Sequence, residues 1–129
     1  MKWNSEMLEN IYLSIEEISN IKFQKKLWEN KIPGMISSYI EAVCSLFDDS
    51  CFDIFIDDYL NRIEVSKEFK EKIENLREEL NLFDGSEMTN RQIFKHPKWI
   101  NIAEIAKVII SQWNKEIIGN ESNYQRARA

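Results

Sequence analysis

The sequence feature that most constrains the fold is the spacing of the apolar residues, which recur every three or four positions through most of the chain. Strict alternation of apolar and polar residues, the pattern of a half-buried strand, is never sustained for more than a few positions. Helix-breaking residues are scarce, because the 129 residues include only three Gly and two Pro. We therefore predict an all-α protein, folded as a single compact helical bundle of about six helices.

Local signals indicate where these helices begin and end. Ser5 and Ser66 are expected to act as N-caps, and Pro97 suits the first position of the last helix. Thr89 and Gln92 have the spacing of a capping box, which predicts a short helical turn before that proline. The longer helices are expected over residues 5–18, 20–31, 35–47, 50–62, 66–80 and 97–117.

The length of the chain limits its domain organisation. With 129 residues, of which 43% are hydrophobic, the chain can build one core but not a second independent one. We expect residues 1–119 to form a single helical domain. Residues 120–129, NESNYQRARA, offer almost nothing to bury and are expected to form a flexible C-terminal tail.

Several classes of protein and site are excluded by what the sequence lacks. No apolar run approaches the roughly 18 to 20 residues of a membrane span, and the start MKWNSEMLEN is too polar for a signal peptide. We expect a cytoplasmic protein with no membrane partner. Cys44 and Cys51 have no CxxC spacing, so we expect reduced, partly buried thiols and neither a disulfide nor a metal site. We expect no cofactor, and His96, the one histidine, excludes any mechanism that needs two imidazoles.

The net charge of the chain is −5, and it is unevenly distributed. Acidic residues number 22 against 17 basic ones, which argues against direct nucleic acid binding because that needs a dense Lys/Arg face. Summed by segment, residues 1–47 carry −1, residues 48–64 carry −5 and residues 65–129 carry +1. The whole net charge therefore lies in the segment DDSCFDIFIDDYLNRIE, which is the clearest functional lead.

A helix over this segment would align its carboxylates. Asp53 and Asp57 are one helical turn apart, and Asp49 lies just before the expected helix start, so the three are expected along one exposed edge. Arg62 follows Asp58 by four residues, but no cation stands at pairing distance in the sequence from Asp53 or Asp57. Such a row of like charges costs a few tenths of a kcal/mol unless a partner uses it.

Three interpretations of the acidic segment remain open. The first is a solvated helix face, and the second is a docking surface for a basic protein, with Tyr59 as the apolar anchor. A third is a magnesium site, because Asp48, Asp49 and Asp53 have DDxxxD spacing, although a second acidic motif is missing. The candidate partner-binding residues are Asp48, Asp49, Asp53, Asp57, Asp58, Tyr59 and Glu64.

A second motif, RQIFKH, runs from Arg91 to His96. It is similar to the Arg-x4-to-6-His pattern of the helical HEPN ribonucleases, in which the two residues contact the scissile phosphate and a polar residue, here Gln92, follows the arginine. Against that function, Pro97 interrupts the helix at the histidine and an acidic domain repels RNA. The structural alternative is that His96 caps the last helix or packs beside Trp99.

The block LFDDSCFDIFIDDYL and the closing segment HPKWINIAEIAKVI also suggest a family. Together with the size and the acidic helical character, they make the chain resemble the all-helical immunity proteins of bacterial contact-dependent growth inhibition and related polymorphic toxin systems. This resemblance implies a protein that binds and blocks a cognate toxin domain, often a nuclease with a basic substrate groove. We therefore expect a non-enzymatic immunity protein, with a HEPN-like ribonuclease using Arg91 and His96, or a helical scaffold or regulatory protein, as alternatives.

Overall fold

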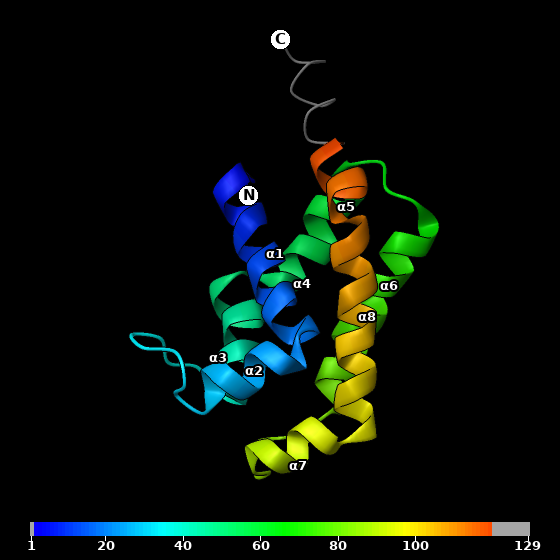
Figure 1. Cartoon of the computed structure of the whole chain (residues 1–129). Coiled ribbons are helices and arrows are strands. Elements are labelled where there is room, and N and C mark those ends of the chain that lie inside the picture. Colours follow the sequence, from blue (N-terminus) through cyan, green and yellow to red (C-terminus); the bar gives the residue numbers. More distant parts are fainter. Residues whose placement is uncertain (1, 120–129) are drawn as a thin grey trace.

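In the computed structural model, residues 2–119 are described, and within that range they form seven continuous helices and no strand (Figure 1). Three of the seven helices end in or contain a π-helical turn, labelled η. The elements are α1 (Ser5–Ser19), α2 (Ile21–Trp28), α3 (Tyr39–Cys44), η1 (Ser45–Asp49), α4 (Phe52–Ile54), η2 (Phe55–Tyr59), α5 (Leu60–Arg62), α6 (Lys67–Leu82), α7 (Asn90–Lys95), α8 (Pro97–Trp113) and η3 (Asn114–Ile118). The prediction of an all-α bundle is confirmed.

Most of the expected helix ends are confirmed. The Ser66 hydroxyl accepts the backbone N–H of Phe69 at 3.1 Å and caps α6. Thr89 forms the capping box expected at the start of α7, and Pro97 is the first residue of α8. The first helix is capped by Asn4 instead of Ser5, because the Asn4 side chain accepts the backbone N–H of Met7 at 2.8 Å.

The third helix begins later than the sequence suggests. Residues 29–38 form an irregular connection, in which Gly34 has φ +78° and Met35 is 47% exposed. The helix starts only at Tyr39, where the Ser38 hydroxyl accepts the N–H of Glu41 at 3.1 Å. The expectation that this helix begins at residue 35 is therefore wrong, because the N-cap is Ser38.

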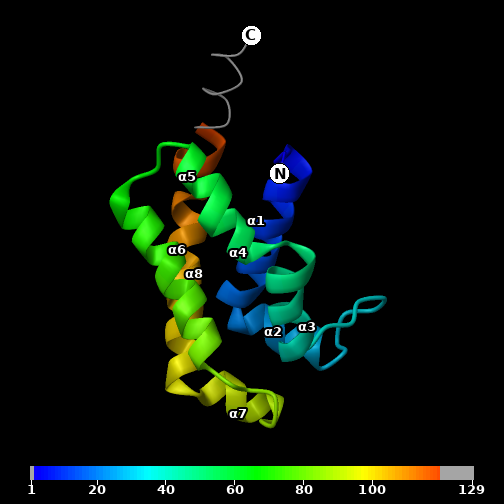
Figure 2. The ribbon, with the colours of Figure 1, turned by 180° about the vertical axis from the view of Figure 1, so that it is seen from behind.

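The last long helix, α8, is the centre of the bundle. It packs against α1 on one side and α6 on the other, and it runs antiparallel to both (Figure 1). The view from behind shows the segment from α4 to α5 lying across the space between α1 and α6 (Figure 2). One cluster of buried residues joins these helices, and its largest fully buried members are Trp99, Phe52, Phe55, Phe69, Ile11, Ile15 and Ile18.

A buried glutamine forms hydrogen bonds that connect three helices inside this core. Gln24 of α2 is fully buried, and its amide nitrogen donates to the carbonyls of Glu17 at 2.8 Å and Ile18 at 2.9 Å. Its amide oxygen accepts the indole N–H of Trp99 at 2.9 Å. These bonds satisfy two carbonyls at the C-terminal end of α1 as well as the indole N–H, which would otherwise be buried without a partner.

Tyr39 anchors the start of α3. Its hydroxyl donates to the carbonyl of Phe83 at 3.1 Å and accepts the N–H of Gly85 at 3.2 Å. A Cβ at Gly85 would lie 2.9 Å from the Phe83 ring, so this close approach requires glycine. Burial raises the pKa of Tyr39, an effect that the Gly85 hydrogen bond reduces and the charge of Asp84 increases.

The other sequence expectations have mixed outcomes. Trp28, Trp99 and Trp113 are buried. The expectation of partly buried thiols holds for Cys51 and is wrong for Cys44, which is exposed. No helix within residues 2–119 is long and apolar enough to cross a membrane. The expected flexible tail, residues 120–129, lies outside the described residues.

Candidate docking surface

The acidic segment folds as two helices and not as one. Asp48 and Asp49 end the first helix in η1, whereas Asp53 and Asp57 belong to the helix that begins at α4. Cys51 separates them in a left-handed backbone conformation, with φ 57° and ψ 51°. Asp49 therefore lies before the helix start, as expected, but in a separate helix that Cys51 divides from the next one, whereas Asp53 and Asp57 share one edge, where Arg77 bonds to both.

Most of the carboxylates in this segment face solvent. We call the set Asp48, Asp49, Asp53, Asp57, Asp58 and Glu64 the acidic surface, and all of its members except Asp58 are exposed. The side chains of Asp53 and Asp57 are 61% and 67% exposed. The structure thus leaves these charges accessible to a partner, although it distributes them over two consecutive helices and, at Glu64, the connection after α5.

Arg77 of α6 neutralises part of the acidic surface. Its Nη1 atom lies 3.3 Å from Asp53 Oδ1 and 3.0 Å from Asp57 Oδ1, so one guanidinium bridges the two carboxylates. The pKa of Arg77 is raised: partial burial acts to lower it, but the hydrogen bonds and charges of Asp57 and Asp53 outweigh burial. The expectation of an unneutralised row is wrong, because a cation 20 residues beyond Asp57 in the sequence folds back onto it.

Asp58 contacts two side chains, of which its spacing in the sequence predicted only Arg62. Its Oδ1 accepts from Nε of Arg62 at 2.9 Å, which is the expected pair one turn along the helix. Its Oδ2 accepts the indole N–H of Trp3 at 3.2 Å. Asp58 therefore holds the N-terminal segment against this helix, and its carboxylate is less available to a partner than those of Asp53 and Asp57.

Tyr59 is not an exposed anchor. It is only 8% exposed, and its ring packs against Trp3 and Phe55 with centroid distances of 5.7 and 5.6 Å. The exposed apolar residue of this helix is Ile54, which is 43% exposed and precedes Asp58 by one turn. Ile54 does not lie on the apolar face that the helical spacing of this segment predicts. An apolar residue at a position expected to face solvent is the sequence signal that could have identified it.

Two π-helical turns, η1 and η2, lie within or beside the acidic segment. In η1 the N–H of Ser50 donates to the carbonyl of Ser45 at 2.9 Å, five residues earlier in the chain. Such widened turns are rare and occur frequently at functional sites, where they change the direction of side chains. Two of the three such turns within residues 2–119 therefore lie at the acidic surface, and the third, η3, ends α8.

The structure also shows where the residues of the candidate metal site and of the RQIFKH motif lie. Within residues 2–119 no three Asp, Glu, His or Cys side chains gather closely enough to hold a metal ion, so Asp48, Asp49 and Asp53 do not form such a group. His96 caps α8, because its Nδ1 accepts the backbone N–H of Lys98 at 3.1 Å, and its ring meets Phe83. The structural alternative for His96 is confirmed. Arg91 instead lines a separate pocket between α2 and α7.

Comparison with family models, curated proteins and solved structures finds no match to this chain. Its function must therefore be inferred from its own residues.

Proposed function

We propose that this chain is a non-enzymatic binding protein whose acidic surface docks onto a basic protein domain. In its specific form, the proposal is that the chain is a cytoplasmic immunity protein. It binds a cognate bacterial toxin domain, a nuclease with a basic substrate groove, and covers the active site. Direct contact with nucleic acid is not part of this function.

The observation that carries the proposal is the exposure of Asp48, Asp49, Asp53, Asp57 and Glu64 within one short stretch of chain. Charges of one sign that face solvent accelerate the approach of an oppositely charged partner and favour one orientation of docking. Ile54, exposed beside Asp53, supplies the apolar contact that a stable interface needs at its centre.

The conformation of the segment adds to this support. The left-handed residue Cys51 and the two π-helical turns hold the chain in a shape that a regular helix would not adopt. Local strain of this kind persists where the surrounding structure fixes it, and it is concentrated at functional sites.

A growth-rescue assay tests the proposal with a toxin domain encoded beside this gene. Cells that express the toxin should grow when the wild-type protein is co-expressed. The triple variant Asp49→Lys/Asp53→Lys/Asp57→Lys should fail to protect them, because its surface repels a basic groove. A circular dichroism spectrum like that of the wild type would show that the variant is folded.

The matched control reverses three exposed carboxylates on other elements, in Glu71→Lys/Glu87→Lys/Glu104→Lys. It changes the net charge by the same amount and should still protect the cells. Full protection by the first triple variant would refute the acidic surface as the interface, and failure of the wild-type protein to protect would refute the immunity function itself.

A further inference from the structure

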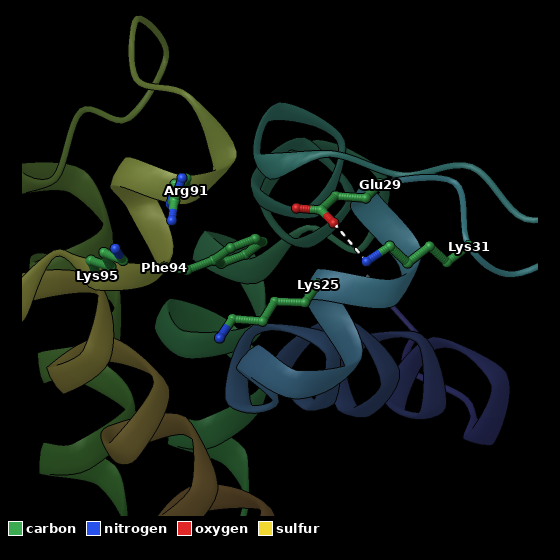
Figure 3. Close-up of a pocket in the computed structure, with 6 residues that line it drawn as sticks. All are labelled: Lys25, Glu29, Lys31, Arg91, Phe94 and Lys95. Atoms are coloured by element: carbon green, nitrogen blue, oxygen red, sulfur yellow. Dashed lines mark ion pairs between the residues drawn. The ribbon is translucent and has the colours of Figure 1, made fainter.

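A second charged site lies where α2 meets α7, at the end of the bundle opposite α5 (Figure 1). The pocket has a volume of about 430 Å³ and is open to solvent. We call it the basic pocket, and its lining residues are Lys25, Glu29, Lys31, Arg91, Phe94 and Lys95 (Figure 3). Four cations and one carboxylate give it a local charge of +3, in a protein whose net charge is −5.

Most of these cations have no ionic partner within residues 2–119. Lys31 pairs with Glu29 at 3.1 Å, which uses the one carboxylate of the pocket. Among the residues that the structure describes, Lys25, Arg91 and Lys95 form no ion pair. The basic pocket therefore gathers three like charges that no carboxylate of the described residues pairs with, although Lys25 Nζ lies 6.0 Å from the centroid of the Phe94 ring, and the mutual repulsion of these charges is relieved when an anion binds.

The arrangement of the cations suits a single ligand. Arg91 and Lys95 are one turn apart on α7 and so share a face of that helix, while Lys25 extends from α2 on the other side of Phe94 (Figure 3). Phe94 is only 7% exposed and packs on Trp28 with a centroid distance of 5.4 Å. Its ring provides a rigid apolar part of the wall, which strengthens charge interactions by excluding water on that side.

The chemistry of these side chains identifies the class of anion. A guanidinium presents a planar fork that matches two phosphate oxygens, and lysines add point charges without fixed geometry. Three unpaired cations exceed what a single carboxylate needs. A pocket of about 430 Å³ has the size of a small-molecule site. A long nucleic acid strand would also meet the acidic remainder of the protein.

We propose that the basic pocket binds the oligophosphate group, two or three linked phosphates, of a small phosphorylated molecule. The pocket shares no residue with the acidic surface, so the two sites are tested separately. The expected ligands are inorganic tripolyphosphate and nucleoside triphosphates, because both carry the group that the cations recognise.

Isothermal titration calorimetry with the full chain tests this assignment, with sodium tripolyphosphate, ATP and adenosine as probes. Tripolyphosphate and ATP should bind saturably with one site per chain, and adenosine should not bind. The affinity should fall between about 50 mM and about 150 mM salt, because ions screen the exposed cations. Equal affinities for ATP and tripolyphosphate would assign recognition to the phosphates alone, and tighter binding of ATP would add the nucleoside as a second determinant.

Substitutions in the basic pocket test whether its cations bind the phosphates. Arg91→Gln/Lys95→Gln should weaken tripolyphosphate binding by about tenfold or more, and Arg91→Lys, which keeps the charge but removes the fork, should weaken it less. The control Lys67→Gln/Lys107→Gln removes the same charge from two exposed side chains outside the pocket and should change the affinity by less than about twofold. Circular dichroism checks that each variant is folded.

Three results would overturn the proposal. Absence of saturable binding of both phosphorylated probes would remove the site. Equal weakening in the pocket and control variants would show a nonspecific effect of net charge. Tighter binding of a short RNA than of tripolyphosphate, lost in the same pocket variant, would replace the small ligand with a nucleic acid.

Discussion

The acidic surface and the basic pocket carry opposite charges and are assembled in opposite ways. The acidic surface comes from one contiguous segment, residues 48–64, and two arginines, Arg62 and Arg77, are bonded to its carboxylates. The basic pocket combines residues from α2 and the connection that follows it with residues of α7, which are more than fifty positions away in the sequence. Three of its cations lack an ion pair among the described residues.

This difference shows that the clustering of charged residues and the compensation of their charge are separate properties, which are easily confused when only the sequence is known. Clustering of charge along the chain is visible in the sequence, but compensation of charge depends on side chains that folding brings close. Counting Arg77 with the acidic segment changes its sum from −5 to −4, whereas the basic pocket keeps +3 after its only internal ion pair is counted. Charge without an ion-pair partner is the stronger indication of a ligand site. Charge that is clustered and exposed is the stronger indication of a docking surface.

The largest expected effect concerns the core beneath the basic pocket. Gln24→Leu should lower the free energy of unfolding by about 3 kcal/mol, because the buried Trp99 indole N–H and Ile18 carbonyl lose the hydrogen bonds that Gln24 supplies, and the Glu17 carbonyl keeps only the N–H of Asn20 at 3.3 Å. Urea denaturation followed by circular dichroism measures the change. Lys26→Ala, at an exposed position of the same helix, is the control and should cost less than about 0.5 kcal/mol. A loss below about 1 kcal/mol in Gln24→Leu would contradict this role.

The next effect tests the turn that divides the acidic surface. Cys51→Gly should raise the free energy of unfolding by about 1 kcal/mol, since glycine adopts the left-handed conformation without the steric cost of a Cβ. Cys51→Val should lower it by at least as much, because a β-branched residue tolerates that conformation poorly. Thermal unfolding of both variants provides the measurement. Equal stability of the Gly and Val variants would show that the backbone at this position is not under strain.

Removal of the compensating cation tests the comparison most specifically. Arg77→Gln should cost only about 0.5 kcal/mol of stability, because Asp53 and Asp57 are mostly exposed and screened by solvent. It should nevertheless speed the association of the acidic surface with a basic partner, since two carboxylates lose their neutralising charge. Denaturation and stopped-flow binding measure the two effects. Slower association than that of the wild type would mean that Arg77 itself contributes to docking.

The smallest effect is a change in thiol reactivity at the edge of the acidic surface. Partial desolvation of the sulfur, followed by the charge and hydrogen bond of Asp48, raises the pKa of Cys44 even though the residue is exposed, so less thiolate is present at a given pH than for a free cysteine. In a Cys51→Gly background, Asp48→Asn should therefore shift the pH profile of Cys44 alkylation by iodoacetamide to lower pH. An unchanged midpoint would show that Asp48 does not act on the thiol.

The sequence predicted the fold because helical signals are local. The apolar spacing, the Ser66 cap and the Thr89 capping box involve residues within one or two turns, and each is found in the structure. Gln24 escaped prediction since nothing local distinguishes a buried amide from a surface one. Its partner Trp99 is 75 residues away.

The candidate sites were only partly predictable for the same physical reason. The exposed carboxylates of the acidic surface follow from the charge count, but their bridging by Arg77 depends on how α6 packs. Tyr59 shows the converse error, because a tyrosine next to exposed aspartates can still point into the core. The motif RQIFKH drew attention to Arg91, but its combination with Lys25 and Lys31 could not be predicted, because the two halves of the basic pocket meet only in the folded bundle.

The most direct test of docking through the acidic surface is the dependence of association rate on salt, measured by stopped-flow with the basic toxin domain that the proposed function requires. The rate constant for the wild-type protein should fall by about tenfold or more as salt is raised from about 20 to about 200 mM, because ions screen the attraction between the two surfaces. In Asp49→Lys/Asp53→Lys/Asp57→Lys the rate at low salt should be much lower and nearly independent of salt. Equal rates and equal salt dependence in the two proteins would contradict the proposed docking surface.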